Sequence, residues 1–86
     1  MLTEPMTLYK LMNLYMLKQV NFPLTNAQLI SFFTEHDYTT YFTLQQALGE
    51  LEDAGLVRKE ASHNSTRYEI TKEGEETLNF FGKNIS

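Results

Sequence analysis

The chain of 86 residues contains no cysteine, and no apolar run in it approaches the roughly 20 residues that a membrane-spanning helix needs. The lack of cysteine excludes disulfides and thiolate zinc sites, and it is typical of proteins in a reducing cytosol. The amino-terminal residues also lack the basic start and the small-residue cleavage site of a signal peptide. These absences predict a cytoplasmic protein that does not associate with a membrane.

Basic residues are few, since seven Lys and Arg stand against eleven Asp and Glu and the net charge is −4 at pH 7. This balance disfavours strong non-specific attraction to nucleic acid. The charges are unevenly distributed, however. Four of the seven basic residues lie within residues 58–72, and acidic residues cluster at 50–53 and 73–76. The sequence therefore contains one locally basic segment in an acidic chain.

The length and composition predict a single globular domain, because 42% of the residues are hydrophobic and no repeat or linker divides the chain. A chain this short buries only about 60–65% of its extended surface. We therefore expect a thin core that burial against a partner would stabilise.

Hydrophobic periodicity predicts a first helix over residues 6–20. The stripe with i, i+3, i+4, i+7 spacing, predicted to be buried, consists of Leu8, Leu11, Met12 and Tyr15. Further apolar residues widen this stripe beyond what one small domain needs, so we expect the helix to be covered on more than one side.

Caps and turns define the next two helices. Thr25 and Gln28 form a capping box at the start of a second helix over residues 26–36. A third helix, over about 41–54, follows Thr40 as its cap and ends at Gly55, which adopts positive φ without strain. The buried face of the third helix is predicted to consist of Leu44, Ala47, Leu48 and Leu51.

After Gly55 the spacing of the apolar residues changes to the alternation that is typical of strands. This pattern predicts a hairpin with strands over residues 56–61 and 66–70 and a turn over 62–65, and Thr71 is the predicted cap of a last helix. The predicted order is helix, helix, helix, strand, strand, helix, a mainly α fold with a small β-hairpin. A short turn between the second and third helices, with a hairpin directly afterwards, is typical of a winged helix-turn-helix.

The segment FTLQQALGELEDAGLVRKE, followed by TRYEITKEGEETL, resembles bacterial regulators of the PadR and MarR type. One recurrent pattern of those regulators matches at Leu44, Leu48, Leu51, Gly55 and Leu56, and a second matches at Tyr68, Ile70, Thr71 and Gly74. The stretches FPLTNAQL and YFTLQQ resemble a bacterial domain of unknown function with winged-helix character. The resemblance covers about residues 6–82 and implies one DNA-binding domain over residues 1–86, either alone or as the N-terminal part of a longer protein.

The outer face of the third helix is the candidate for reading DNA bases. Its polar groups are neutral: Gln pairs with adenine N6 and N7, and Thr contacts phosphates or thymine methyls. A glycine inside a helix costs roughly 1 kcal/mol, which indicates that Gly49 leaves room for a partner. The residues predicted to contact DNA are Thr39, Thr40, Tyr41, Thr43, Gln45, Gln46 and Gly49. The alternative is a solvated helix face with threonine caps.

The hairpin is the candidate wing, because contacts to phosphates fix the position of a protein on DNA while contacts to bases specify the sequence. The residues predicted to contact DNA from the wing are Arg58, Lys59, His63, Asn64 and Arg67. The alternative is that these charges pair with neighbouring carboxylates on the surface, where such pairs contribute little.

The first and last helices are the candidate dimer contact, since their surplus of apolar residues suits a self-complementary interface. The residues predicted to form it are Tyr9, Met12, Leu14, Met16, Leu17, Phe80 and Phe81. The alternative is that this surface covers a downstream domain.

The sequence does not predict an enzyme. It contains no nucleophile with a partner base and no Gly-rich phosphate loop, and neither His36 nor His63 has a second ligand at a suitable spacing. We therefore expect no catalytic residue, metal or cofactor. The hypothesis is a dimeric transcriptional regulator that reads the major groove of double-stranded DNA with the helix of residues 40–54 and contacts phosphates with the wing of residues 56–70. The alternative is a winged-helix module that binds protein, or dimerises, without DNA. A small-molecule effector stays open.

Overall fold

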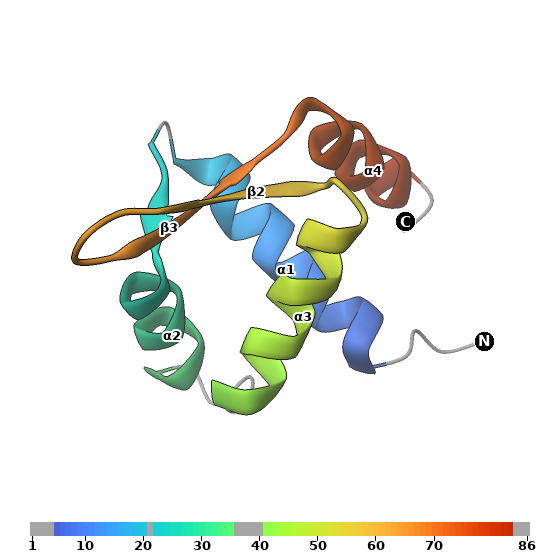
Figure 1. Ribbon diagram of the computed structural model, residues 1–86. Helices are drawn as coiled ribbons and strands as arrows, with labels where there is room; N and C mark the ends of the chain where they lie inside the picture. The colour runs from blue at the N-terminus through green and yellow to red at the C-terminus, as the bar shows by residue number, and fades with distance from the viewer. Residues whose placement is uncertain (1–4, 21, 36–40, 84–86) are drawn as a thin grey trace.

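The computed structural model describes residues 5–20, 22–35 and 41–83. Its elements, in chain order, are α1 (Pro5–Gln19), β1 (Leu24–Thr25), α2 (Asn26–Glu35), α3 (Tyr41–Asp53), β2 (Val57–Ala61), β3 (Thr66–Ile70) and α4 (Lys72–Lys83). Figure 1 shows α1 running through the middle of the molecule, with α3 and the strands packed across it and α4 beside it. The predicted mainly α fold with a small hairpin is confirmed, in a winged-helix-like layout.

The sheet contains one strand that the sequence analysis did not predict. Its strand order is β1-β3-β2 with antiparallel pairing, and Leu24 in β1 lies opposite Tyr68 in β3. The predicted capping box is present at the same place. The Thr25 N–H donates to Gln28 Oε1 at 2.9 Å, and the Gln28 N–H donates to Thr25 Oγ1 at 3.1 Å. One short segment therefore both extends the sheet and starts α2.

The core surrounds α1 and is built from leucines of several elements. Leu14, Leu29, Leu44, Leu48, Leu51 and Val57 are each at most 2% exposed. Because α1 contacts α3, α4 and β3, its broad apolar surface is covered on several sides within one chain, as its composition indicated.

The orientation of α1 differs from the prediction. Leu8 and Tyr15 of the predicted buried stripe are 48% and 59% exposed, whereas Leu14 and Leu17 face the core. The reason is that α1 is apolar around most of its circumference, so the spacing of its apolar residues does not distinguish the inner face from the outer one. Half of the predicted stripe, Leu8 and Tyr15, therefore lies on the outer face of α1, while Met12 packs partly against the core.

A compact junction fixes the hairpin relative to α3. Gly55 has φ of 79° and its N–H donates to the Glu52 carbonyl at 3.0 Å, while the Leu56 N–H donates to the Leu51 carbonyl at 3.0 Å. These two bonds form a Schellman motif, which ends α3. The direction in which β2 leaves α3 is therefore set by local backbone geometry.

Thr71 connects the junction of α3 and β2, which we call the α3–β2 corner, to the start of α4. Its hydroxyl accepts from the Gly74 N–H at 3.0 Å as the predicted helix cap, and it donates to the Gly55 carbonyl at 2.8 Å. Gly74 lies so close to the corner that an added Cβ would come within 2.2 Å of the Leu56 carbonyl oxygen. The close approach requires glycine at this position and holds the base of the hairpin rigidly.

Candidate nucleic-acid interface

The outer side of α3 is a continuous exposed line of residues. Leu44, Ala47, Leu48 and Leu51 are buried as predicted. The opposite side exposes Phe42, Gln46, Gly49 and Asp53, at positions i, i+4, i+7 and i+11 of one helix face. We call these four residues the α3 ridge. Phe42 is its most exposed large side chain, at 75%.

The structure separates the two glutamines that the sequence placed together. Gln45 is half-buried, and its Nε2 donates to Asn26 Oδ1 at 2.6 Å. It therefore connects α3 to the start of α2 and does not lie on the ridge, contrary to the prediction. Gln46 is exposed, and its Nε2 makes a long contact of 3.4 Å with Glu50 Oε2. Its amide is therefore accessible to a partner.

The other predicted recognition residues divide in the same way. Tyr41 is exposed at the start of α3, Thr43 is half-buried, and Thr39 and Thr40 lie outside the described residues. Phe42 in α3 was not predicted as a contact, because the prediction selected side chains that can form hydrogen bonds, together with Gly49. Its spacing of four residues from Gln46 and seven from Gly49 is the signal that would have identified it.

Gly49 has no structural requirement in the described part of the chain. An added Cβ there would meet nothing within 4 Å, and its φ is not in the positive range. Glycine inside a helix is roughly 1 kcal/mol less favourable than alanine. The folded chain therefore gains nothing from this glycine, and the ridge has a place where another molecule could approach the helix backbone.

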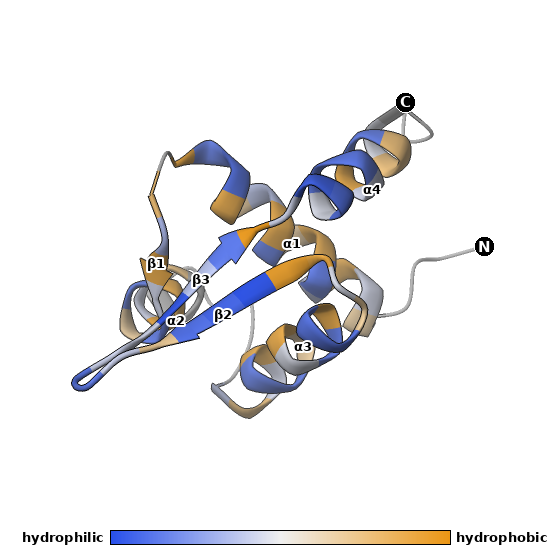
Figure 2. Ribbon diagram, turned by 45° about the horizontal axis from the view of Figure 1, so that its top comes forward, coloured by the Kyte–Doolittle hydropathy of each residue, from blue (hydrophilic) through white to orange (hydrophobic). Residues whose placement is uncertain are grey.

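The hairpin extends beyond the rest of the domain and becomes hydrophilic toward its tip (Figure 2). His63 and Asn64 are exposed in the turn, which is closed by the Ser62 N–H donating to the Ser65 carbonyl at 2.8 Å. The Ser62 hydroxyl also donates to the same carbonyl, at 3.1 Å. These bonds order the tip, so both predicted tip residues are presented to solvent on a defined turn.

The basic residues of the hairpin do not form one strip, because alternate residues of a strand point to opposite faces. Arg58 lies opposite Glu69 across the strands and forms an ion pair with it. Lys59 points to the other face, where its Nζ is 3.7 Å from Glu52 Oε1 on α3. Both cations are thus partly neutralised within the chain. Such exposed pairs contribute little to stability, so a phosphate could compete for them.

Arg67 is the exposed cation that lies nearest the tip of the hairpin. It is opposite Glu60 in β2 and Thr25 in β1, on the same face of the sheet as Arg58. Among the hairpin residues predicted to contact DNA, Arg67, His63 and Asn64 are exposed, and none of the three forms an ion pair within the described part of the chain.

The acidic end of α3 is partly compensated by cations from other elements. Lys10 of α1 places its Nζ 2.6 Å from Glu50 Oε1, and this hydrogen bond lowers the pKa of Glu50 below its ordinary range. Lys59 Nζ lies 3.7 Å from Glu52 Oε1. Asp53 is the member of this acidic group that lies on the ridge, at its C-terminal end. The N-terminal half of the ridge therefore carries only neutral side chains.

The predicted dimer residues are mostly covered within the chain. Leu14 and Leu17 are 1% and 3% exposed, so the prediction that they form an interface is wrong: both belong to the core. Met12 and Met16 pack partly against that core, and Tyr9 and Phe81 are half-buried. Phe80 is 62% exposed and meets the Phe81 ring edge to face at 5.6 Å.

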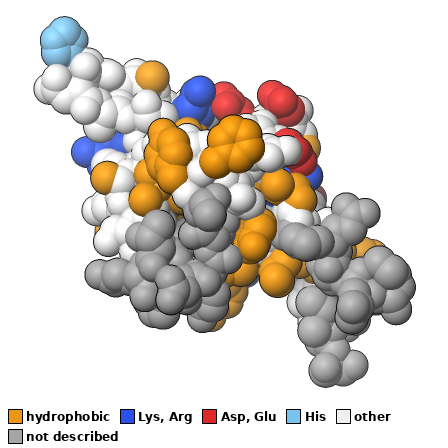
Figure 3. Space-filling model, turned by 90° about the horizontal axis from the view of Figure 1, so that it is seen from below, with side chains coloured by type: hydrophobic (Ala, Val, Ile, Leu, Met, Phe, Trp, Pro, Cys, Tyr) orange, Lys and Arg blue, Asp and Glu red, His pale blue; other side chains and the backbone are white. Residues whose placement is uncertain are grey.

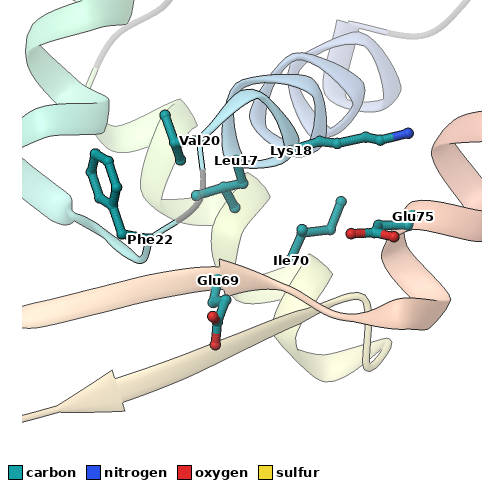
Figure 4. A pocket seen from close by; sticks show the side chains of 7 residues that line it. All are labelled: Leu17, Lys18, Val20, Phe22, Glu69, Ile70 and Glu75. Carbon is teal, nitrogen blue, oxygen red and sulfur yellow. The ribbon is translucent and has the colours of Figure 1, made fainter.

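A groove of about 260 Å³ lies between α1, the segment before β1, β3 and α4 (Figure 4). Its walls combine apolar side chains with one lysine and two carboxylates: Leu17, Lys18, Val20, Phe22, Glu69, Ile70 and Glu75. Across the described ranges, no group of three or more His, Cys, Asp or Glu residues could hold a metal ion. None of the helices in those ranges is long and apolar enough to cross a membrane.

Comparison with known proteins yields a family match. No curated protein matches the chain. One family model matches residues 9–86, a range that includes α3, the hairpin and α4 and therefore the whole candidate interface. The chain belongs to the family DUF4364, described as a domain of unknown function.

Proposed function

We propose that the protein is a DNA-binding transcriptional regulator of the winged-helix kind, similar to PadR and MarR regulators. The observation that carries the proposal is the arrangement of α3. This helix buries its leucines and leaves Phe42, Gln46 and Gly49 uncovered beside a projecting hairpin. A helix presented in this way fits the major groove, and the hairpin beside it reaches the neighbouring backbone.

In the proposed mechanism, α3 contacts the DNA bases and the hairpin contacts the DNA backbone. The ridge reads base edges through neutral groups, with the Gln46 amide suited to adenine N6 and N7 and Gly49 permitting close approach. Arg67, His63 and Asn64 contact phosphates, which fix the position of the ridge. Arg58 and Lys59 add to this contact when they exchange Glu69 and Glu52 for phosphate oxygens.

The distribution of side chains on the face that contains the start of α3 supports these separate roles of the ridge and the hairpin. Figure 3 shows apolar side chains exposed in the middle of that face, with Lys, Arg and acidic side chains to one side of them. The base edges of a duplex are uncharged and its backbone is anionic. A neutral helix start beside a hairpin with exposed cations is complementary to that pattern.

Selection of bound duplexes from a random pool tests the proposal. The protein is expected to enrich a defined site, and Gln46→Ala is expected to weaken binding to that site while leaving the urea midpoint unchanged. Gln45→Ala is the matched control, because losing the bond to Asn26 lowers stability by about 1 kcal/mol without removing a ridge group. Failure to enrich any duplex would contradict the proposal.

The second candidate function is binding of a protein partner through the same ridge. The net charge of −4 and the carboxylates facing Arg58 and Lys59 favour it, as do the exposed rings of Tyr41 and Phe42. The dependence of binding affinity on salt concentration distinguishes the two candidate functions. DNA binding weakens with a log–log slope of about −0.9 per phosphate contact, whereas an apolar protein contact keeps its strength.

We further propose that the regulator is a homodimer, formed by the outer faces of α1 and α4. The exposed apolar residues on these helices are Leu8, Tyr15 and Phe80, and they replace the buried leucines that the sequence analysis assigned to the contact. Lys18 on α1 and Glu76 on α4 are exposed, so pairing α1 of one copy with α4 of the other would bring opposite charges together. An isologous contact of this kind repeats itself across the two-fold axis.

A further inference from the structure

Phe42 is the residue of the candidate interface that the proposed contacts leave without a role. At 75% exposure it is the most exposed large hydrophobic residue of the described chain. A phenylalanine ring kept in water forgoes the gain of burial, about 25 cal/mol for each Å² of apolar area. Within the described residues, its ring is not part of the core cluster. Its place at the start of the ridge makes the ring available to a partner with an apolar surface.

The major groove offers one prominent apolar group. Its edges are hydrogen-bond donors and acceptors except at thymine, whose C5-methyl projects into the groove and is contacted by apolar side chains. Guanine is read by Arg or Lys, and neither occurs on the ridge. Cytosine is read by carboxylates, and the carboxylate of the ridge, Asp53, lies at its C-terminal end, about two turns beyond Gln46. The chemistry of the N-terminal half of the ridge therefore matches thymine and adenine.

The spacing of the ridge sets the spacing of the bases. Phe42 and Gln46 are four residues apart, which places them about 6 Å apart along the helix axis. Base pairs repeat every 3.4 Å or so along a strand, so the two side chains reach base pairs roughly two steps apart. Gly49, one turn further on, adds no side chain and lets the helix lie close to the groove there.

We propose that Phe42 is a specificity-determining residue that contacts the C5-methyl group of a thymine, with Gln46 on an adenine about two base pairs away. This inference rests on the proposed DNA-binding function. It adds the base composition of the site, which neither the fold nor the family assigns.

Deoxyuridine substitution tests the inference directly. A duplex selected by the protein is synthesised with each thymine replaced in turn by deoxyuridine, which removes only the methyl group. At one position the substitution is expected to weaken binding about fourfold, the equivalent of one buried methyl. In Phe42→Ala the same duplex pair is expected to bind equally, because the contact is absent.

Two further variants make the test specific. Phe42→Leu keeps an apolar group at the position and is expected to retain a preference for thymine over deoxyuridine. Phe22→Ala removes another exposed phenylalanine, 57% exposed and outside α3, and is expected to keep the fourfold difference. Since Phe42 is largely exposed, its replacement leaves the core intact.

These measurements distinguish failure of the proposed thymine contact from failure of the proposed DNA-binding function. If no duplex is selected, the proposed function fails and the inference fails with it. If a duplex is bound but no thymine is sensitive to loss of its methyl, or if Phe42→Ala keeps the sensitivity, the inference alone is overturned. A sensitive thymine whose effect disappears in Phe42→Ala supports it.

Discussion

Single residues account for both the stability and the candidate specificity of this domain, and its glycines show the difference. Gly74 has no room for a side chain, since an added Cβ would lie 2.2 Å from the Leu56 oxygen and 2.8 Å from Ile70 Cγ1. Gly49 has open space around it. The first glycine is required by the fold, and the second is dispensable for folding but lies on the ridge.

The two glycines predict opposite results for the same substitution. Gly74→Ala is expected to lower the free energy of unfolding by about 1–3 kcal/mol, because the methyl overpacks the junction of α4 with the α3–β2 corner. Gly49→Ala is expected to raise it by up to about 1 kcal/mol through helix propensity, and to weaken DNA binding. Urea unfolding of both variants measures the stabilities. Equal effects of the two substitutions would refute this account of the junction.

Tyr68 makes the fold sensitive to alkaline pH. Burial raises its pKa above the ordinary value of 10.0, and the Glu52 carboxylate adds to the effect. Because the folded chain holds this proton more tightly than the unfolded chain, the associated stability is fully present below about pH 10 and is lost as the pH rises through the folded pKa. The urea midpoint is expected to fall over that range and to fall less steeply in Tyr68→Phe. Identical pH profiles for the two proteins would count against the assignment to Tyr68.

At the scale of elements, the sequence predicts what local signals specify. The capping box of Thr25 and Gln28, the Gly55 helix end and the Thr71 cap each depend on residues a few positions apart, and all three are present in the structure. The two-residue strand β1 is too short to show alternation, so it was missed. Its existence depends on pairing with β3, more than forty residues further along the chain.

Contacts between elements could not be predicted from the sequence. The face of α1 that points inward depends on how α3, α4 and β3 pack on a helix that is apolar nearly all round. The partner of Gln45 lies on α2, and the partners of the hairpin cations lie on α3 and β3. Of the candidate site, the ridge helix and the hairpin were therefore predictable and the contact of Gln45 was not, whereas the exposed position of Phe42 could have been inferred from its spacing to Gln46 and Gly49.

The outer face of α1 yields a prediction about assembly. Tyr15→Glu places a charge at a position that is 59% exposed in the single chain, so it is expected to leave the fold intact and to convert the dimer to a monomer. Sedimentation velocity at tens of micromolar measures this change. Gln46→Glu, which adds the same charge to an exposed position on α3, is expected to stay dimeric. A wild-type protein that sediments as a monomer would contradict the proposed homodimer.

At the scale of the whole molecule, we expect the affinity for DNA to depend more on how the charges are paired within the chain than on the net charge. Glu52 and Glu69 occupy two cations that could otherwise contact phosphates. The double variant Glu52→Gln, Glu69→Gln changes the net charge from −4 to −2, because each substitution removes one negative charge. It is expected to bind the selected duplex more tightly, with a log–log salt slope steeper by roughly 1.8 for two additional phosphate contacts.

The control for this prediction changes the same charge elsewhere. Glu73 and Glu75 are exposed on α4, outside the proposed DNA contact and not among the residues proposed for the dimer contact, and replacing both with Gln is expected to alter affinity slightly and the salt slope hardly at all. Duplex titrations at several salt concentrations measure both variants. Equal slopes in the two double variants would show that Arg58 and Lys59 do not contact phosphates.

The central claim, that the α3 ridge and the hairpin together contact DNA, is tested most directly by the amide NMR spectrum of the protein during titration with the selected duplex. The account predicts that the largest shifts occur at Phe42, Gln46 and Gly49 and in the turn from Ser62 to Ser65. Shifts confined to α1 and α4, or no shifts at concentrations where the duplex is bound, would contradict it.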